Sequence, residues 1–209
     1  MKNELLPIRF QGISETVYAG FGPRLGAKIL DFLIMVPVMG ILLYISGLSK
    51  SAYFYTVIPN LLIGIFFEVC LVKIYGGTPE KLIMGLKIIQ KNGDDVDWKP
   101  ALYRYSVELF LAILAIYVMI LTLNMIDDST YASLGFMERN KLISTINPLP
   151  NTIQTWLSGI WIVSGLIVLL TNARKRTTHD FIAGTVVVKS IFIDKIREIA
   201  NSSTDEEVE

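Results

Sequence analysis

Four long apolar segments constrain this chain more than any other feature of its sequence. Each has about 20 residues, which is the length that an α-helix needs to cross the hydrocarbon core of a bilayer. Their approximate limits are residues 29–48, 53–72, 107–125 and 153–171. The composition agrees, because 52% of the 209 residues are hydrophobic and only 18% are charged. We therefore predict an all-α membrane protein with four transmembrane helices.

The distribution of Lys and Arg predicts how these helices are oriented. Of the 19 basic residues, only Lys50, Arg139 and Lys141 fall on the side opposite the chain termini. Basic residues concentrate on the cytoplasmic side of membrane proteins, so we expect both termini and the loop around residues 75–104 to be cytoplasmic. The chain then divides into a cytoplasmic arm (1–23), a membrane domain (24–190), and a cytoplasmic amphipathic segment with an acidic tail (191–209). We expect the tail, "NSSTDEEVE", to be disordered. In the arm, the Gly and Pro residues of "YAGFGP" predict a break before the first helix.

The cytoplasmic middle loop contains a short structural pattern that occurs twice. Thr78 and Pro79 predict the start of a short interfacial helix through Met84, followed by strand, turn and strand in "LKIIQ", "KNGDD" and "VDW". The segment "EKLIMGLKIIQ" resembles "HDFIAGTVVVK", with Gly85 and Gly184 at matching places. We predict two half-units whose strands, "LKIIQ" and "TVVVK", pair beneath the membrane as small β elements.

Two carboxylates fall inside the predicted membrane segments. Asp31 lies near the start of the first and Glu68 near the cytoplasmic end of the second. A charge at the centre of a membrane helix costs roughly 2.5 to 3.5 kcal/mol on insertion scales, so such a group faces the bundle or water. Asp31 follows Arg24 by two helical turns, and we expect the two to share a neighbour. Two readings stay open: Asp31 is paired structurally with an Arg, or Asp31 and Glu68 form a proton-binding site.

Other chemistry has little support in the sequence. A single cysteine, Cys70, and a single histidine, His179, exclude disulfide frameworks and make a metal site improbable, and common hydrolase and nucleotide-binding motifs are absent. We expect no enzyme activity and no cofactor or metal. The net charge of zero gives no reason to expect nucleic-acid binding. His179 adjoins Asp180, and this pairing predicts an imidazole that titrates near physiological pH.

Four motifs in order resemble the RDD family of membrane proteins, whose name records an Arg and two Asp residues. They are "GFGPRLGAKILDFLI", "GGTPEKLIMGLKII", "KPALYRY" and "RKRTTHDFIAGTVVV", and they cover roughly residues 19–190. By position the Arg corresponds to Arg24 and the two Asp to Asp31 and Asp180. The family commonly has Gly where this chain has Glu80. The resemblance implies a multi-pass protein of the bacterial cytoplasmic membrane, with cation/proton exchange proposed for some members.

Together these observations favour a small transporter, of the Na⁺/H⁺ exchange type, that works as a homo-oligomer in the lipid bilayer. Asp31, with Glu68, is the expected site for a monovalent cation or proton. Arg24 is expected to hold either Asp31 or Asp180. The remaining residues of the expected counter-ion and structural network are Arg104, His179, Asp180 and Lys81. The alternative is a non-transporting membrane scaffold or assembly factor in which Arg24, Asp31 and Asp180 form a structural ion-pair network.

Overall fold

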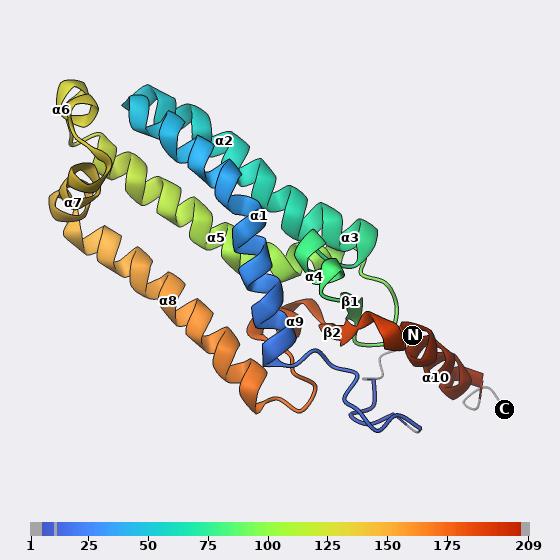
Figure 1. The fold of residues 1–209 in the computed structure, drawn as a ribbon. Coiled ribbons are helices and arrows are strands. Elements are labelled where there is room, and N and C mark those ends of the chain that lie inside the picture. The colour runs from blue at the N-terminus through green and yellow to red at the C-terminus, as the bar shows by residue number, and fades with distance from the viewer. Residues whose placement is uncertain (1–5, 11, 206–209) are drawn as a thin grey trace. The chain divides into compact units, whose positions relative to one another are not determined.

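Four long helices make up most of the fold (Figure 1). The computed structural model describes residues 6–10 and 12–205, with side chains up to residue 199. The long helices are α1 (Phe21–Leu48), a continuous helix Lys50–Tyr75, α5 (Trp98–Leu123) and α8 (Pro148–Thr171). Within the described residues these four are long and apolar enough to cross a membrane. The prediction of four candidate membrane spans is confirmed.

Each helix begins before its apolar segment, because the hydropathy of a sequence marks the apolar part of a helix and not its polar ends. α1 starts at Phe21 and includes Gly22 and Pro23. Proline is tolerated in the first turn of a helix, where its missing N–H has no partner to lose. The predicted break at "YAGFGP" is therefore wrong for the last three residues of that motif. α5 likewise starts at Trp98, so that Arg104 lies on the helix.

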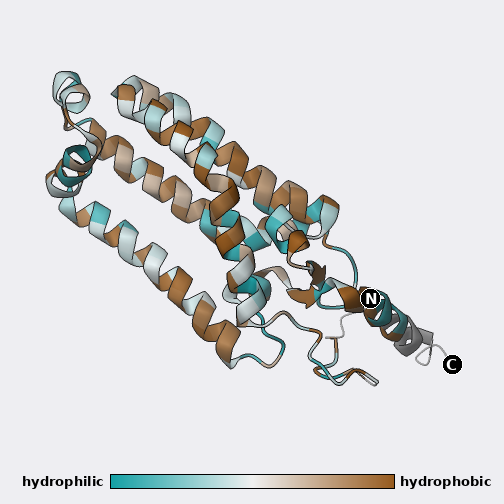
Figure 2. Ribbon diagram, viewed as in Figure 1, coloured by the Kyte–Doolittle hydropathy of each residue, from teal (hydrophilic) through white to brown (hydrophobic). Residues whose placement is uncertain are grey.

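Large apolar side chains on these helices are exposed on the isolated chain. Phe32, Ile41 and Phe110 each have about 60% of their surface accessible, at 60%, 61% and 62%. Figure 2 shows hydrophobic residues along all four long helices and hydrophilic ones on α7 (Phe136–Ile146). Such surfaces are stable against lipid chains and not against water. The chain is a membrane protein with several apolar helices.

The chain forms two compact units. The first unit contains the described residues up to Phe32, the segment Phe66–Tyr105, and the chain from Ser164 onward. The second unit contains Leu33–Ile65 and Ser106–Val163. All the predicted site residues belong to the first unit.

A two-stranded sheet organises the first unit. Helix α4 (Pro79–Ile83) leads into β1 (Leu86–Gln90), and α9 (Thr178–Ala183) leads into β2 (Thr185–Lys189). The strands are antiparallel, with Leu86 opposite Lys189 and Gln90 opposite Thr185. This confirms the predicted pairing of "LKIIQ" with "TVVVK". Between each helix and its strand the chain turns through a glycine with positive φ, +65° at Gly85 and +67° at Gly184.

The two helix–glycine–strand segments are related by a local twofold pseudosymmetry. Gly85 and Gly184 are 99 positions apart, and so are the two residues of the central pair, Ile88 and Val187. A twofold axis through that pair exchanges the strands and keeps their register. The same offset makes Glu80 the counterpart of His179, and Lys81 the counterpart of Asp180.

The N-terminal arm and the C-terminal helix cover one face of the sheet. Val17 and Ala19 form backbone hydrogen bonds with Lys189 and Val187, so the arm adds a third extended segment beside β2. Helix α10 (Ile193–Asp205) follows the short helix η2 (Ser190–Phe192). The buried cluster on this face consists of Leu6, Phe10, Val17, Tyr18, Ile89, Val186, Val188 and Ile196.

Two sequence expectations for this region need correction. The segment "VDW" does not form a strand, because the chain leaves the sheet to begin α5 at Trp98. The residue before the segment, Asp95, forms an isolated β-bridge with Ile89. The predicted acidic tail is helical as far as Asp205, and its last four residues lie outside the described part.

The second unit contains two further helices between α5 and α8. These are α6 (Asp128–Ser133) and α7. The Lys50 ammonium donates to the Ile126 carbonyl (2.5 Å) and pairs with Asp128 (2.7 Å). The Tyr131 hydroxyl donates to the Ser46 carbonyl at 2.8 Å. These contacts fix the end of α5 and the helix that follows it to the neighbouring helix ends.

Candidate functional site

Asp180 is the most completely bonded charged residue of the first unit. It is the third residue of α9, and Thr177 is the residue before that helix. Both the backbone N–H and the hydroxyl of Thr177 donate to Asp180 Oδ2, at 2.9 and 2.8 Å. This reciprocal capping places the carboxylate at the positive end of a short helix. The side chain of Asp180 has no exposed surface.

Two guanidinium groups from different membrane helices meet at this carboxylate. Arg24 Nη1 of α1 lies 3.0 Å from Oδ2, and Arg104 Nη1 of α5 donates to Oδ1. Arg24 also donates to the backbone carbonyls of Ala19 (3.0 Å) and Lys175 (2.6 Å). We call Arg24, Arg104 and Asp180 the Asp180 network. Of the two partners that the sequence left open for Arg24, the structure places Asp180 against it.

The charges around Asp180 control the ionisation of this residue and of its neighbour His179. Burial acts to raise the pKa of Asp180, but Arg104 and Arg24 outweigh it and hold that pKa well below its usual value. For His179, burial is the main influence, and with Arg104 it lowers the pKa to about 3. The prediction that His179 titrates near physiological pH is therefore wrong; the imidazole is neutral there because its cationic form is buried beside arginines.

Asp31 lies outside this network. Its carboxylate pairs with Lys28, one helical turn earlier, at 2.7 Å. Asp31 is about one-fifth exposed and Lys28 three-quarters exposed, at 21% and 75% of their side-chain surface. The expectation that Arg24 and Asp31 share a neighbour is wrong, because Arg24 extends to the segment before α9 while Asp31 bonds within its own helix.

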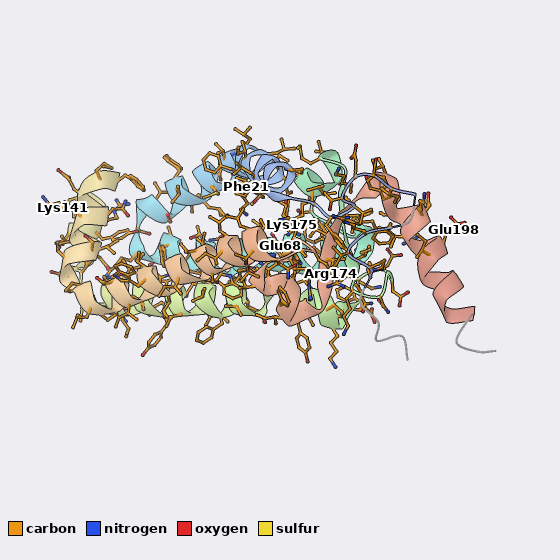
Figure 3. The ribbon with its side chains drawn as sticks, turned by 90° about the horizontal axis from the view of Figure 1, so that it is seen from below. Phe21, Glu68, Lys141, Arg174, Lys175 and Glu198 are labelled. Carbon is orange, nitrogen blue, oxygen red and sulfur yellow. The ribbon has the colours of Figure 1, made fainter. Side chains whose placement is uncertain are left out.

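Glu68 lies in a helical irregularity of the second membrane span. Between α2 (Lys50–Ile65) and α3 (Leu71–Tyr75) the chain forms a π-helical turn, η1 (Phe66–Cys70), with Glu68 at its centre. A π-turn inserts a residue into the helix and re-aims the side chains around it, and such turns are frequent at functional sites. Figure 3 labels Glu68 among the side chains of the first unit.

Lys81 connects Glu68 to helix α4. The ammonium of Lys81 lies 2.8 Å from Thr78 Oγ1, 3.4 Å from Glu80 Oε1 and 3.9 Å from Glu68 Oε1. The Thr78 hydroxyl also donates to Glu80 Oε1. We call Glu68, Thr78, Glu80 and Lys81 the Lys81 site. Its three oxygen atoms come from two separate segments of the chain and surround one cation.

Glu80 is the unusual member of the Lys81 site. Only 3% of its side-chain surface is exposed, and its second oxygen, Oε2, is buried without a hydrogen-bond partner in the described part of the chain. A buried carboxylate oxygen normally has at least one donor, because leaving it without one forfeits its hydration energy. Sequence reasoning treated Glu80 only as a departure from the RDD pattern, and its neighbour Thr78 only as a helix cap.

Further charged groups act on the Lys81 site. Glu68 interacts electrostatically with Arg104, Lys28 and His179 as well as with Lys81. Lys28 likewise interacts with Glu80 and is the partner of Asp31. Most of the predicted site residues thus form two bonded groups, one around Asp180 and one around Lys81. Asp31 is bonded to Lys28, which acts on Glu68 and Glu80 only electrostatically. No cluster of three or more His, Cys, Asp or Glu side chains suited to a metal ion occurs in the described ranges.

Comparison with known proteins agrees with this arrangement of motifs. The model of the RDD family matches residues 18–184. No curated protein and no solved structure matches the chain. The matched segment runs from the arm that extends the sheet to the glycine after α9, and it contains both Arg24 and Asp180. The chain belongs to the RDD family of membrane proteins.

Proposed function

We propose that this protein exchanges a monovalent cation for a proton across a bacterial cytoplasmic membrane. The observation that carries the proposal is the Lys81 site, where Glu68, in a membrane helix, and the buried Glu80 share one lysine. The two carboxylates share Lys81 as an ion-pair partner, while Lys28 and Arg104 also act on the site electrostatically, and the oxygens around Lys81 can hold another positive charge in its place. A proton or a cation can supply it, and competition between the two for one place couples their movements.

In this proposal Asp31 belongs to the entry side of the site and not to its centre. It is paired with the exposed ammonium of Lys28, which itself interacts with Glu68 and Glu80. The Asp180 network holds α1, α5 and α9 in fixed positions while the Lys81 site changes occupancy. Both termini are proposed to be cytoplasmic, from the distribution of Lys and Arg, and the working form to be a homo-oligomer without enzymatic activity.

The test is cation flux in proteoliposomes under an imposed pH gradient. Wild type is compared with Glu68→Gln and Asp31→Asn, each checked for monodispersity. Glu108→Gln is the matched control: Glu108 is also a membrane carboxylate, but it belongs to the second unit and accepts from Trp161 Nε1 at 3.4 Å. We expect Glu68→Gln to abolish exchange, Asp31→Asn to weaken it, and Glu108→Gln to retain it. Retained exchange in a well-folded Glu68→Gln protein would refute the mechanism.

The Asp180 network favours a second candidate, a non-transporting membrane scaffold. Its carboxylate accepts from two guanidinium groups and from Thr177, as expected for a structural centre. The double variant Arg24→Asp with Asp180→Arg, which swaps the two charges, tests such a pair. Because Arg104 also binds Asp180, the exchanged protein would place two arginines together, and we expect it to remain unstable. Restored folding would show that Asp180 depends on its pair with Arg24 and not on Arg104.

A further inference from the structure

The Lys81 ammonium has the surroundings of a bound monovalent cation. Three oxygen atoms lie within 3.9 Å of Nζ, a hydroxyl from Thr78 and carboxylate oxygens from Glu80 and Glu68. Carboxylate and hydroxyl oxygens are the ligands that hard cations prefer. An ammonium group carries the same charge as an alkali ion and makes the same kind of contact with oxygen.

The position of Lys81 in the chain leaves its ammonium able to move. The residue follows Glu80 in α4, a helix of five residues, and 21% of its side-chain surface is exposed. Its contact with Glu68, at 3.9 Å, is the longest of the three. By contrast, only 3% of the Glu80 side chain is exposed, so this carboxylate is held more firmly than the ammonium that it contacts.

Glu80 Oε2 is a second, independent observation that points to a ligand at this carboxylate. This oxygen is buried and has no partner in the described part of the chain, although Oε1 of the same carboxylate accepts from both Thr78 and Lys81. A structural ion pair would satisfy both oxygens. A cation bound at the carboxylate would give Oε2 its missing partner.

We propose that the Lys81 ammonium is a tethered occupant of a monovalent cation site formed by Glu68, Thr78 and Glu80, and that a small free cation displaces it. This inference rests on the proposed exchange function and names its substrate site. A tethered group competes at an effective concentration of the order of millimolar. Lys81 therefore sets how much cation is needed before the site is filled, while the charges of Arg104 and Lys28 contribute to the electrostatic potential at the site.

The experiment measures cation binding to the purified full-length protein through the rise of its melting temperature with NaCl or KCl concentration. Choline chloride keeps the ionic strength constant. The variants are Lys81→Met, Lys81→Met with Glu80→Gln, and, as the control lysine, Lys73→Met, whose ammonium pairs with Asp97 at 3.4 Å. We expect Lys81→Met to lower the apparent Kd for the cation about tenfold, since the tethered competitor is gone. The added Glu80→Gln change should remove this binding, and Lys73→Met should leave the apparent Kd near the wild-type value.

An apparent Kd unchanged in Lys81→Met, or a stabilisation that choline produces equally, overturns the inference. Lys81→Gln, which keeps a polar end without the charge, carries the same expectation if Lys81→Met does not fold. The flux assay separates the two proposals. If wild type exchanges ions but Lys81→Met does not change cation binding, only the inference of a tethered occupant is refuted. Saturable binding in Lys81→Met without any flux in wild type refutes only the exchange function.

Discussion

Asp180 and Asp31 are both aspartates paired with a basic residue, yet their surroundings predict very different roles in stability. Asp180 is fully buried between Arg24 and Arg104, whose side chains are 14% and 5% exposed. Removing one partner of a buried charge network leaves the others without compensation, which costs about 3–5 kcal/mol. A pair in which one partner is well exposed, as Lys28 is beside Asp31, contributes roughly 0–1 kcal/mol.

We therefore expect Asp180→Asn to lower the free energy of unfolding by about 3–5 kcal/mol and Asp31→Asn by less than about 1 kcal/mol. Unfolding in detergent, followed by circular dichroism against denaturant concentration, measures both. Equal losses in the two variants would show that the Asp180 network is not the structural centre of the first unit.

His179 gives the stability a predictable pH dependence. Its pKa is lowered from 6.5 to about 3, so the unfolded chain binds a proton at a pH where the folded protein does not. Stability from this residue is present above pH 6.5 and is lost as the pH falls toward 3, at no more than about 1.4 kcal/mol per pH unit. Asp180, whose pKa is also lowered, adds a loss in the same direction at lower pH.

His179→Gln removes the first of these contributions. We expect the wild-type free energy of unfolding to fall more steeply than that of the variant between pH 6 and pH 4, where the difference is due to His179. Parallel curves for the two proteins would mean that the imidazole binds a proton in the folded state.

At the scale of elements, the glycines that precede and follow the short helices control where the strands begin. Gly184 has a φ of +67°, and a Cβ added there would meet nothing within 4 Å. Gly76 has a φ of +77°, and its added Cβ would lie 2.5 Å from Lys87 Cε and 2.8 Å from Lys87 Cγ. The backbone cost of alanine is similar at both glycines, but only Gly76 adds a steric clash.

We expect Gly184→Ala to lower the free energy of unfolding by about 1 kcal/mol, the usual cost of a left-handed conformation for a residue with a Cβ. Gly76→Ala should cost clearly more, because Lys87 must move away from its pair with Asp95. The same denaturant experiment tests the order of the two, and the reverse order would contradict the described turn.

The sequence predicted some of these elements well and others not at all. Apolar length predicted the four long helices, and the repeated glycine and β-prone residues predicted that β1 pairs with β2. Nothing in the residue pattern marks η1, since a π-turn depends on how neighbouring segments pack and not on local composition. For the same reason, sequence patterns identified Arg24 and Arg104 as important but did not decide whether Asp31 or Asp180 is the partner of Arg24.

At the scale of the whole molecule, the charged residues of this membrane protein fall into two groups with different tasks. The Asp180 network is fully bonded and buried, and we assign it to stability. The Lys81 site has a buried oxygen without a partner in the described residues, and ion exchange is the role that we propose for it. Glu80, which replaces the glycine common in the family, was missed as a site residue because its burial depends on the packing of α4 and not on its neighbours in sequence.

The most direct test of this assignment measures both ions at once. Wild-type proteoliposomes containing a pH-sensitive dye receive an outward proton gradient and labelled sodium or potassium outside. The account predicts that cation uptake and loss of internal protons occur together, and that Glu68→Gln abolishes both while Glu108→Gln abolishes neither. Cation uptake without proton movement, or no movement of either ion in well-folded wild type, would contradict it.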